Sequence, residues 1–352
     1  MTLAARWTTV ATVVVVLAVV SVRIGSIAGI THASLPPIVE SFITSDAQVS
    51  PPDRQALLSG GPVIKLLQSN DSTEVAVFGG IWVNAPPSSY VEQLNDIEQF
   101  ERGGAFRVTK RIGDSPSAAD FAELKLPRQD LDDLKDCRIG DCALRLDADT
   151  IQTLRAGVDW SKPTARADAN SVFQRFVLKY VHGYREGGNA RLPVYRHSDR
   201  PVSVASEFRS MVERSPDLAT DLPDLKRYLL EYPQAVLPHS TNFLYWQEVQ
   251  FGLRPTIRVN HLVIQERGDL TVIASKLLYA SHYFRAALET RVLLVDPARG
   301  EGFWLLMVNR GRSGGLSGFI GGLIRGRVRN EAQDAMRSAL TATKTKLESS
   351  SR

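Results

Sequence analysis

The feature of this sequence that most constrains its fold is the order in which strand-like and helix-like segments follow one another. An apolar, β-branched run at 75–84 leads directly into a helix-entry signal, Ala-Pro-Pro-Ser at 85–88. Alternating apolar segments follow much later, at 243–310, and a glycine-rich, basic helix is expected at about 317–347. This order predicts an α+β fold in which a curved antiparallel sheet grips a long C-terminal helix and leaves a cavity between them.

The later strands form a predicted hairpin meander. We expect them at 243–251, 256–266, 270–284, 291–295 and 303–310, with turns at 267–269 and 296–300. Between the second strand, 106–112, and this meander, the pattern from about 114 to 240 becomes helical and is interrupted by prolines. Helices are predicted there at 121–134, 149–154, 167–184, 202–212 and 222–230. We interpret this block as a large helical insertion, and the helix-spaced aromatic residues between 173 and 184 as its core.

The N-terminus has the layout of an export signal. Arg6 precedes an apolar run from Val10 to Val20, which is the arrangement of a secretory signal peptide. Residues 1–33 are therefore predicted to be either a signal peptide or an uncleaved N-terminal membrane anchor, since the 31–33 segment is a weak cleavage site. Residues 34–53, rich in Pro and Ser, are interpreted as a linker before a domain at 54–352. We expect an exported protein, periplasmic or extracellular, free or tethered to the inner membrane.

Composition sets limits on the class of protein. With 352 residues, of which 43% are hydrophobic and 23% charged, the chain is long enough to bury a sizeable core. Its formal net charge of +4 is mild, so nucleic acid is not an expected partner.

The two cysteines, Cys137 and Cys142, lie close together in the sequence. In an exported chain this spacing favours a disulfide-closed loop, with Gly140 permitting a tight turn. An inert reduced pair remains open, and so does redox or metal chemistry, although no further ligands are spaced for a metal. Because the ring is short, a disulfide here should stabilise the fold by only about 2 kcal/mol.

Three parts of the chain together resemble the START-like, or helix-grip (SRPBCC-type), superfamily of lipid and hydrophobic-ligand binding proteins. They are the strand-to-helix passage at 83–87, the meander at 243–310 and the last helix. The chain is also similar to an uncharacterised group of exported bacterial proteins, through Cys-x-x-Gly-x-Cys at 137–142, Tyr-Trp at 245–246 and Tyr-Ala-Ser-His-Tyr-Phe at 279–284. The resemblance implies a ligand cavity, which the insertion of over a hundred residues could cap, fill or replace.

Aromatic side chains on the predicted strands are candidate ligand contacts. Tyr245, Trp246, Tyr279 and Trp304 combine apolar area with a hydroxyl or indole donor. Filling the core is the alternative role for each of them.

Polar candidates lie on the same strands. His261 and His282 would meet only if their strands are neighbours in register, and each is otherwise a core histidine. Asn309 and Arg310 end a strand that opens toward the glycine-rich turn, where they would anchor a polar headgroup.

The start of the last helix contains four glycines between 315 and 322, which are costly in a helix unless a ligand or the sheet approaches closely. A hinge loop with the helix starting near Leu323 is the alternative, and a phosphate-binding loop is a third. The apolar and basic residues from Phe319 to Arg329 would suit contact with an anionic membrane surface, or form an ordinary buried face.

These patterns predict an exported binding protein for a hydrophobic or amphipathic small molecule such as a lipid. No catalytic residue, metal site or cofactor is expected. One alternative is an enzyme of cyclase or hydrolase type on the same scaffold, which a cavity residue of strongly shifted pKa would favour. The other is an envelope interaction protein whose insertion fills the cavity and exposes an apolar patch on 114–240.

Overall fold

A computed structural model describes residues 35–350 with gaps at 253 and 317. The segment predicted as signal peptide or anchor, 1–33, lies outside these residues, as do the side chains of Phe319, Ile320 and Leu323. Within the described range, no helix combines the length and the apolar character needed to cross a bilayer.

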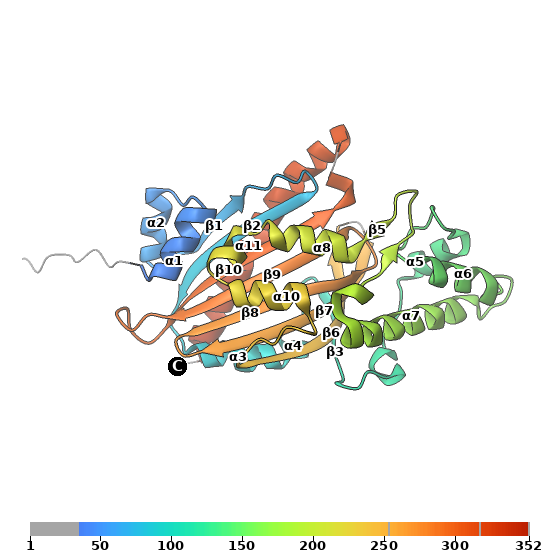
Figure 1. The fold of residues 1–352 in the computed structure, drawn as a ribbon, viewed down its shortest axis with the longest axis horizontal. Coiled ribbons are helices and arrows are strands. Elements are labelled where there is room, and N and C mark those ends of the chain that lie inside the picture. Colours follow the sequence, from blue (N-terminus) through green and yellow to red (C-terminus); the bar gives the residue numbers. More distant parts are fainter. Residues whose placement is uncertain (1–34, 253, 317, 351–352) are drawn as a thin grey trace, which may run out of the picture. The chain divides into compact units, whose positions relative to one another are not determined.

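A single antiparallel sheet organises the described chain (Figure 1). Its eight strands follow the order β1-β2-β10-β9-β8-β7-β6-β3. Their bounds are β1 Val63–Leu67, β2 Glu74–Val83, β3 Phe106–Ile112, β6 Ser240–Phe251, β7 Arg254–Arg267, β8 Leu270–Ala280, β9 Phe284–Val295 and β10 Phe303–Ser313. The α+β fold and the hairpin meander are confirmed, because β6 to β10 pair in chain order.

One turn of the meander differs from the prediction. The expected strand 270–284 ends at Ala280, and the next begins at Phe284 rather than at 291. The chain reverses at Tyr283, whose φ of 57° lies in the left-handed region. A turn built on a tyrosine carries no glycine or proline signal, so the sequence pattern ran through it.

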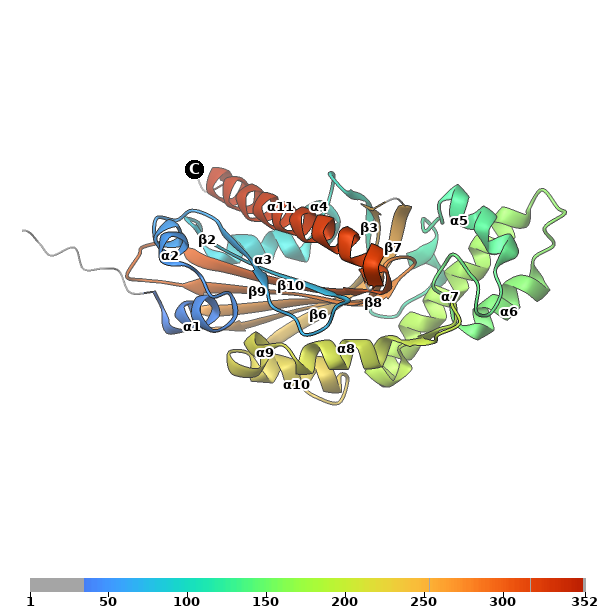
Figure 2. The same cartoon turned by 90° about the horizontal axis from the view of Figure 1, so that it is seen from above.

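Helices cover both faces of the sheet (Figure 2). On one side lie α3 Pro87–Asn95, α4 Ile97–Phe100 and α11 Gly318–Ser350. We call this the α11 side. The long C-terminal helix buries Met336, Leu340 and Leu347 there in one cluster with strand residues such as Ile81 and Leu305. The predicted packing of the tail helix on the sheet is therefore present.

The glycine that permits this close packing belongs to the sheet. A Cβ added to Gly79 of β2 would stand 2.7 Å from Met336 Cγ and 2.8 Å from Leu340 Cδ1. Near the start of the helix, in contrast, a Cβ added to Gly315 would meet no heavy atom within 4 Å, and the atoms nearest to a Cβ added to Gly321 belong to the backbone of Gly315 and Leu316. Neither of these two glycines therefore marks an approach of the sheet.

On the opposite side, which we call the insertion side, shorter helices form the cover. They are α1 Pro37–Ser41, α2 Pro51–Leu58, α8 Val204–Glu213, α9 Pro216–Thr220 and α10 Pro223–Glu231. The prediction of a linker at 34–53 was wrong, since Val39, Phe42 and Ile43 are at most 1% exposed and pack in this layer. Their helix-like spacing spans only two turns, and the surrounding Pro and Ser residues obscured it.

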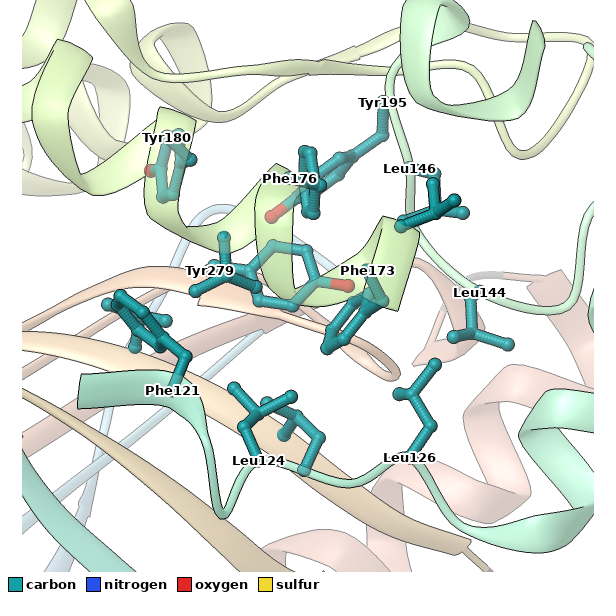
Figure 3. Close-up of a cluster of buried hydrophobic side chains, with 14 of the residues drawn as sticks. Phe121, Leu124, Leu126, Leu144, Leu146, Phe173, Phe176, Tyr180, Tyr195 and Tyr279 are labelled. Atoms are coloured by element: carbon teal, nitrogen blue, oxygen red, sulfur yellow. The ribbon is translucent and has the colours of Figure 1, made fainter. Parts of the chain in front are cut away.

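The rest of the insertion forms a lobe against the β6–β8 end of the sheet. It contains α5 Arg128–Asp133, α6 Ala148–Gly157, α7 Ala165–Gly187 and the two-stranded pair β4 Val194–Tyr195 and β5 Val202–Ser203. The predicted helix 121–134 is split, because Pro127 delays the start of α5 to Arg128. Phe173, Phe176 and Tyr180 of α7 pack on Tyr279 of β8, which confirms the core role predicted for the aromatic stripe (Figure 3).

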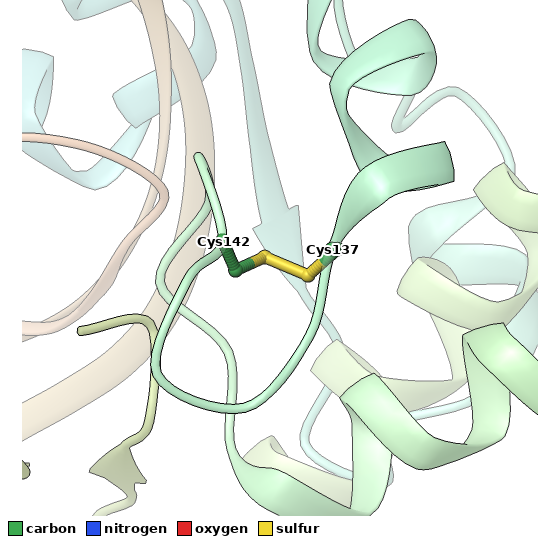
Figure 4. Close-up of a disulfide and its surroundings, with 2 residues drawn as sticks. All are labelled: Cys137 and Cys142. Carbon is green, nitrogen blue, oxygen red and sulfur yellow. A yellow bond between two sulfur atoms is a disulfide. The ribbon is translucent and has the colours of Figure 1, made fainter. Parts of the chain in front are cut away.

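The two cysteines form the predicted disulfide (Figure 4). Their Cα atoms lie 4.4 Å apart, and Gly140 takes a φ of 89° in the closed loop. The loop is also tied to a neighbouring segment, because Gly140 N donates to Arg196 O at 2.8 Å and Cys142 N donates to His197 O at 3.0 Å. The disulfide therefore holds the chain on both sides of residue 140 next to residues 196–197.

Candidate functional site

The eight residues predicted to contact a ligand do not converge on one place. Tyr245 and Asn309 lie on the α11 side of the sheet. The insertion side or the lobe holds Trp246, His261, Tyr279, Trp304 and Arg310, and His282 lies in the turn before β9. Neighbouring residues of a strand point to opposite faces, so the pairs 245–246 and 309–310 are each divided between the two sides.

Three of the predicted aromatic residues pack against side chains of the hydrophobic core. Trp246, Tyr279 and Trp304 are each at most 1% exposed. Trp246 Nε1 donates to Asp120 O at 2.8 Å, and Trp304 Nε1 donates to Asp296 Oδ2 at 3.0 Å. The indole donors of both tryptophans therefore stabilise the fold, whereas the hydroxyl of Tyr279 is buried without a hydrogen-bond partner.

His261 belongs to a buried polar cluster under α7 and α10. Its Nδ1 shares a hydrogen bond with Tyr184 OH at 2.9 Å, and its Nε2 shares one with Asn242 Oδ1 at 3.2 Å. Across the β7–β8 pair stands Lys276, whose ammonium group lies 4.2 Å from the centre of the Phe208 ring. Burial lowers the pKa of Lys276 well below its usual value, and burial together with the Lys276 charge lowers that of His261 to about 3.

His282 and Arg310 are also held by partners within the chain. His282 Nε2 lies 2.9 Å from Asp130 Oδ2 and fastens α5 to the turn, so its partner is not one that His261 shares. Arg310 pairs with Glu74 at 3.4 Å and with Asp217 of α9 at 2.9 Å. All three members of that group are at most 5% exposed. Releasing Arg310 to a ligand would leave buried carboxylates unpaired, which is strongly unfavourable.

A stripe of polar side chains crosses the sheet on the α11 side, and we call it the polar stripe. Its members are Glu101, Tyr245, Gln247, Arg258, Asn260, Ser275, Glu289, Arg291 and Asn309. The strand register places Asn309, Glu289 and Ser275 side by side on β10, β9 and β8. Glu101 is the residue that ends α4, and its side chain reaches Gln247 of β6.

Hydrogen bonds connect one half of the stripe. Gln247 donates to the Glu101 carboxylate and accepts from Asn260 Nδ2 at 3.0 Å. Tyr245 OH shares a hydrogen bond with Ser275 Oγ at 3.1 Å, which spans from β6 to β8. These bonds fix the orientation of the side chains that form the floor of the stripe.

Several polar atoms of the stripe have no partner. Arg291, which is 7% exposed, pairs with Glu289 through Nη2, while its Nε and Nη1 have no hydrogen-bond partner. The same holds for Arg258 Nε and Asn309 Oδ1. An unsatisfied buried polar group costs about 1–3 kcal/mol unless water or a ligand bonds to it, and the same holds for Arg310 Nε and Arg312 Nη2 on the insertion side.

Burial and neighbouring charges shift the pKa of titratable groups in and beside the stripe. Burial raises the pKa of Glu101 to about 7, with Glu289 adding to the shift while Arg291 and Arg258 oppose it. Burial also raises the pKa of Tyr90, whose ring lies 5.9 Å from the Arg291 guanidinium, to about 12. For Arg291, burial lowers the pKa, but Glu289 and the other acidic neighbours outweigh it and keep the guanidinium charged. The site can thus hold a polar group and exchange a proton near neutral pH.

Sequence analysis identified only Tyr245 and Asn309 in this stripe. The missed members include the pairs Arg258 with Asn260 and Glu289 with Arg291, each separated by two positions. Such spacing normally indicates the solvated face of a strand. The signal was present, but only the covering helices show that these residues are partly buried.

Two surface hollows in the described part of the chain lie away from the polar stripe. A shallow one follows α11 and is lined by Arg337, Ser338, Thr341, Ala342, Thr345 and Lys346. A smaller, polar one is lined by Lys110, Arg111, Ala119, Asp120 and Glu123. Neither includes a residue predicted to bind the ligand. Among the described residues, no group of three His, Cys, Asp or Glu side chains is arranged to hold a metal ion.

Comparison with known proteins gives no match to this chain, either among protein-family models or among curated proteins. Its function is therefore inferred from its own residues.

Proposed function

We propose that this protein is an exported, START-like binding protein for a hydrophobic or amphipathic small molecule such as a lipid. The observation that carries the proposal is the set of unpartnered polar atoms on Arg291, Arg258 and Asn309, in a polar stripe that adjoins an apolar cluster on the same side of the sheet. The packing of a long tail helix on an antiparallel sheet agrees with the START-like resemblance. The disulfide agrees with export, because such bonds persist in oxidising compartments.

The ligand would bind on the α11 side, because the aromatic core and the ion pairs of Arg310 and Arg312 occupy the insertion side. Its polar end would accept hydrogen bonds from Arg291 and donate to Asn309. Its apolar part would extend over neighbouring residues such as Met307 and Ile273, where burial contributes about 25 cal/mol per Å². Half-buried Glu289, whose side chain is 27% exposed, marks where solvent reaches the stripe.

Two measurements test this proposal. The first is mass spectrometry of small molecules that copurify with the protein from its native host, and the second is titration with a panel of fluorescent lipids. Asn309→Leu removes an acceptor that has no partner in the fold, and Arg291→Leu removes the central donor. Each should weaken binding at least about tenfold, the effect of losing one charge-assisted or well-placed hydrogen bond.

The matched control is Arg209→Leu, which removes an exposed arginine of α8 on the other side of the sheet. It should leave the affinity unchanged. A protein that carries no ligand and ignores the lipid panel would refute the proposal, and so would equal affinities for all three variants.

Membrane contact through the Phe319–Arg329 region belongs to the same proposal, as the route by which a lipid would be loaded. Within that region Ile324 is 47% exposed, and Arg327 and Arg329 are exposed beside it. An apolar residue flanked by arginines suits an anionic surface. Cosedimentation with anionic vesicles should fall for Ile324→Asp, and an unchanged bound fraction would speak against this route.

A specific observation favours an enzyme as the second candidate function. Glu101 has a pKa of about 7 beside Arg291 and Tyr245, and a carboxyl group of this kind is suited to general acid–base catalysis. A cyclase or hydrolase activity would show a pH profile with an inflection near 7 that Glu101→Gln abolishes. A full panel of ester and polyketide-like substrates without turnover would leave binding as the function.

A further inference from the structure

Arg145, outside the polar stripe, is another buried arginine with an incomplete set of partners. It follows the disulfide loop and is 7% exposed. Its backbone N donates to Ser281 O at 3.1 Å, and its Nη2 donates to the carbonyl of Tyr283. Its Nη1 is buried and has no hydrogen-bond partner. Arginine cannot shed its charge at ordinary pH, so this nitrogen remains an unsatisfied cationic donor.

Two further basic side chains lie within electrostatic range of Arg145. His197 comes from the segment tied to the disulfide loop, and Arg285 comes from the start of β9. Burial lowers the pKa of His197 to about 4, and the charges of Arg145 and Arg285 contribute to that shift. The Nδ1 atom of His197 is buried and also has no partner. Two unsatisfied nitrogen atoms are thus held among neighbouring positive charges.

One carboxylate faces this group. Glu207 of α8 lies 3.5 Å from Arg285 Nη1, and its other oxygen lies 3.5 Å from Arg312 Nη1. Glu207 therefore partly balances Arg285 but makes no ion pair with Arg145. Burial also lowers the pKa of Arg145 to about 10, with Arg285 adding to the effect. Glu207, Tyr195 and Tyr279 favour the charge of Arg145, but no carboxylate of the described residues lies within ion-pair distance of it.

From this geometry we propose that Arg145, His197 and Arg285 form a binding site for an oxyanion of phosphate type, either free phosphate or the phosphate group of a larger ligand. Arg145 Nη1 donates the central hydrogen bond, since charge-assisted bonds from guanidinium to phosphate are short and strong. His197 Nδ1 supplies a second donor in the tautomer that carries its proton there. Arg285, whose side chain is 29% exposed, lies on the solvent side and admits the anion.

The disulfide loop sets the position of this site. Cys142 N bonds to His197 O, and Arg196 N bonds to Leu146 O at 2.8 Å, so residues 142–146 run beside 196–197. Arg145 lies between these two bonds (Figure 4 shows the loop). Breaking the disulfide frees one end of this pairing, and the affinity for the anion should fall with it.

Isothermal titration of the full-length protein with inorganic phosphate tests the proposal. Saturable binding is expected below about 10 mM phosphate, where a site of millimolar Kd is mostly filled. Arg145→Gln and His197→Gln should each weaken binding at least about tenfold. Arg196→Gln is the matched control, because Arg196 is exposed on the same segment, and it should bind as the wild type does.

His197→Gln removes a nitrogen atom with no partner, so it keeps the test valid if Arg145→Gln does not fold. Phenyl phosphate separates the two sources of the anion, since tighter binding than that of phosphate indicates a larger ligand and weaker binding indicates the free anion. No saturable binding of either compound, or equal affinities in the wild type and His197→Gln, would overturn the proposal.

Discussion

The contact between the C-terminal helix and Gly79 gives the sharpest test of the fold that the proposed function needs. Gly79→Ala would place a methyl group 2.7 Å from Met336 Cγ and 2.8 Å from Leu340 Cδ1. Carbon atoms prefer separations of about 3.5–4.0 Å, so one of the two side chains or the helix must shift. Overpacking of this kind costs about 1–3 kcal/mol.

A double-mutant cycle separates the energy of the contact between positions 79 and 336 from the other effects of each substitution on stability. Met336, 2% exposed, is buried against the sheet, so Met336→Ala alone should cost about 2–5 kcal/mol. In the double variant the methyl group introduced at position 79 occupies part of the space that the Met336 side chain leaves. The cost of the double variant should therefore fall short of the sum of the two single costs by at least about 1 kcal/mol.

The assay is equilibrium unfolding in urea, with the free energy of unfolding extrapolated to water for the wild type and three variants. Gly326→Ala is the control on the same helix, because a Cβ there meets no heavy atom within 4 Å. It should stabilise the protein by up to about 1 kcal/mol, as alanine does in a helix interior. Additive costs for the Gly79 and Met336 substitutions would refute the close packing of α11 on β2.

Three further predictions concern buried charges and the disulfide. Glu101→Gln should stabilise the protein by about 1–2 kcal/mol at pH 8 and should change its stability little at pH 4. The reason is that the pKa of Glu101 in the folded state, about 7, exceeds the ordinary 4.5, so the native state favours the neutral acid. An equal gain in stability at both pH values, measured by thermal unfolding, would contradict this. Lys276→Met should raise the free energy of unfolding at pH 7, and this gain should shrink as the pH rises toward 10.5. The pKa of Lys276 is lowered in the folded state, so between the folded pKa and 10.5 the unfolded state binds more protons than the folded state. A lower free energy of unfolding at pH 7 would mean that the hydrogen bonds of Lys276 to Tyr184 and Asn189 outweigh the cost of its burial. Replacing Cys137 and Cys142 together by serine should lower the free energy of unfolding, measured in urea, by about 2 kcal/mol, the low end for disulfides because the loop is short. An unchanged urea midpoint would show that backbone pairing alone holds the loop.

Sequence patterns predicted the segments whose residue types recur at a regular spacing along the chain. The apolar, β-branched and aromatic segments of β6, β7 and β10 predicted these strands, although most of each strand is buried on both faces. The aromatic spacing of α7 and the cysteine spacing around Gly140 were equally informative. The turn at Tyr283 and the short helices at 37–46 were missed, since neither carries a glycine turn signal or a long period.

The sequence by itself determined that an antiparallel sheet, a helical insertion and a long tail helix would form, because backbone periodicity and turn chemistry are local properties. Only the tertiary structure decided which side of the sheet each residue faces and what covers it. Asn309 and Arg310 are adjacent in sequence, yet one faces the α11 side without a partner and the other is enclosed by Glu74 and Asp217. That difference arises because Glu74 and Asp217 come within ion-pair distance of Arg310, while no described side chain bonds to Asn309 Oδ1, and no spacing along the chain records it.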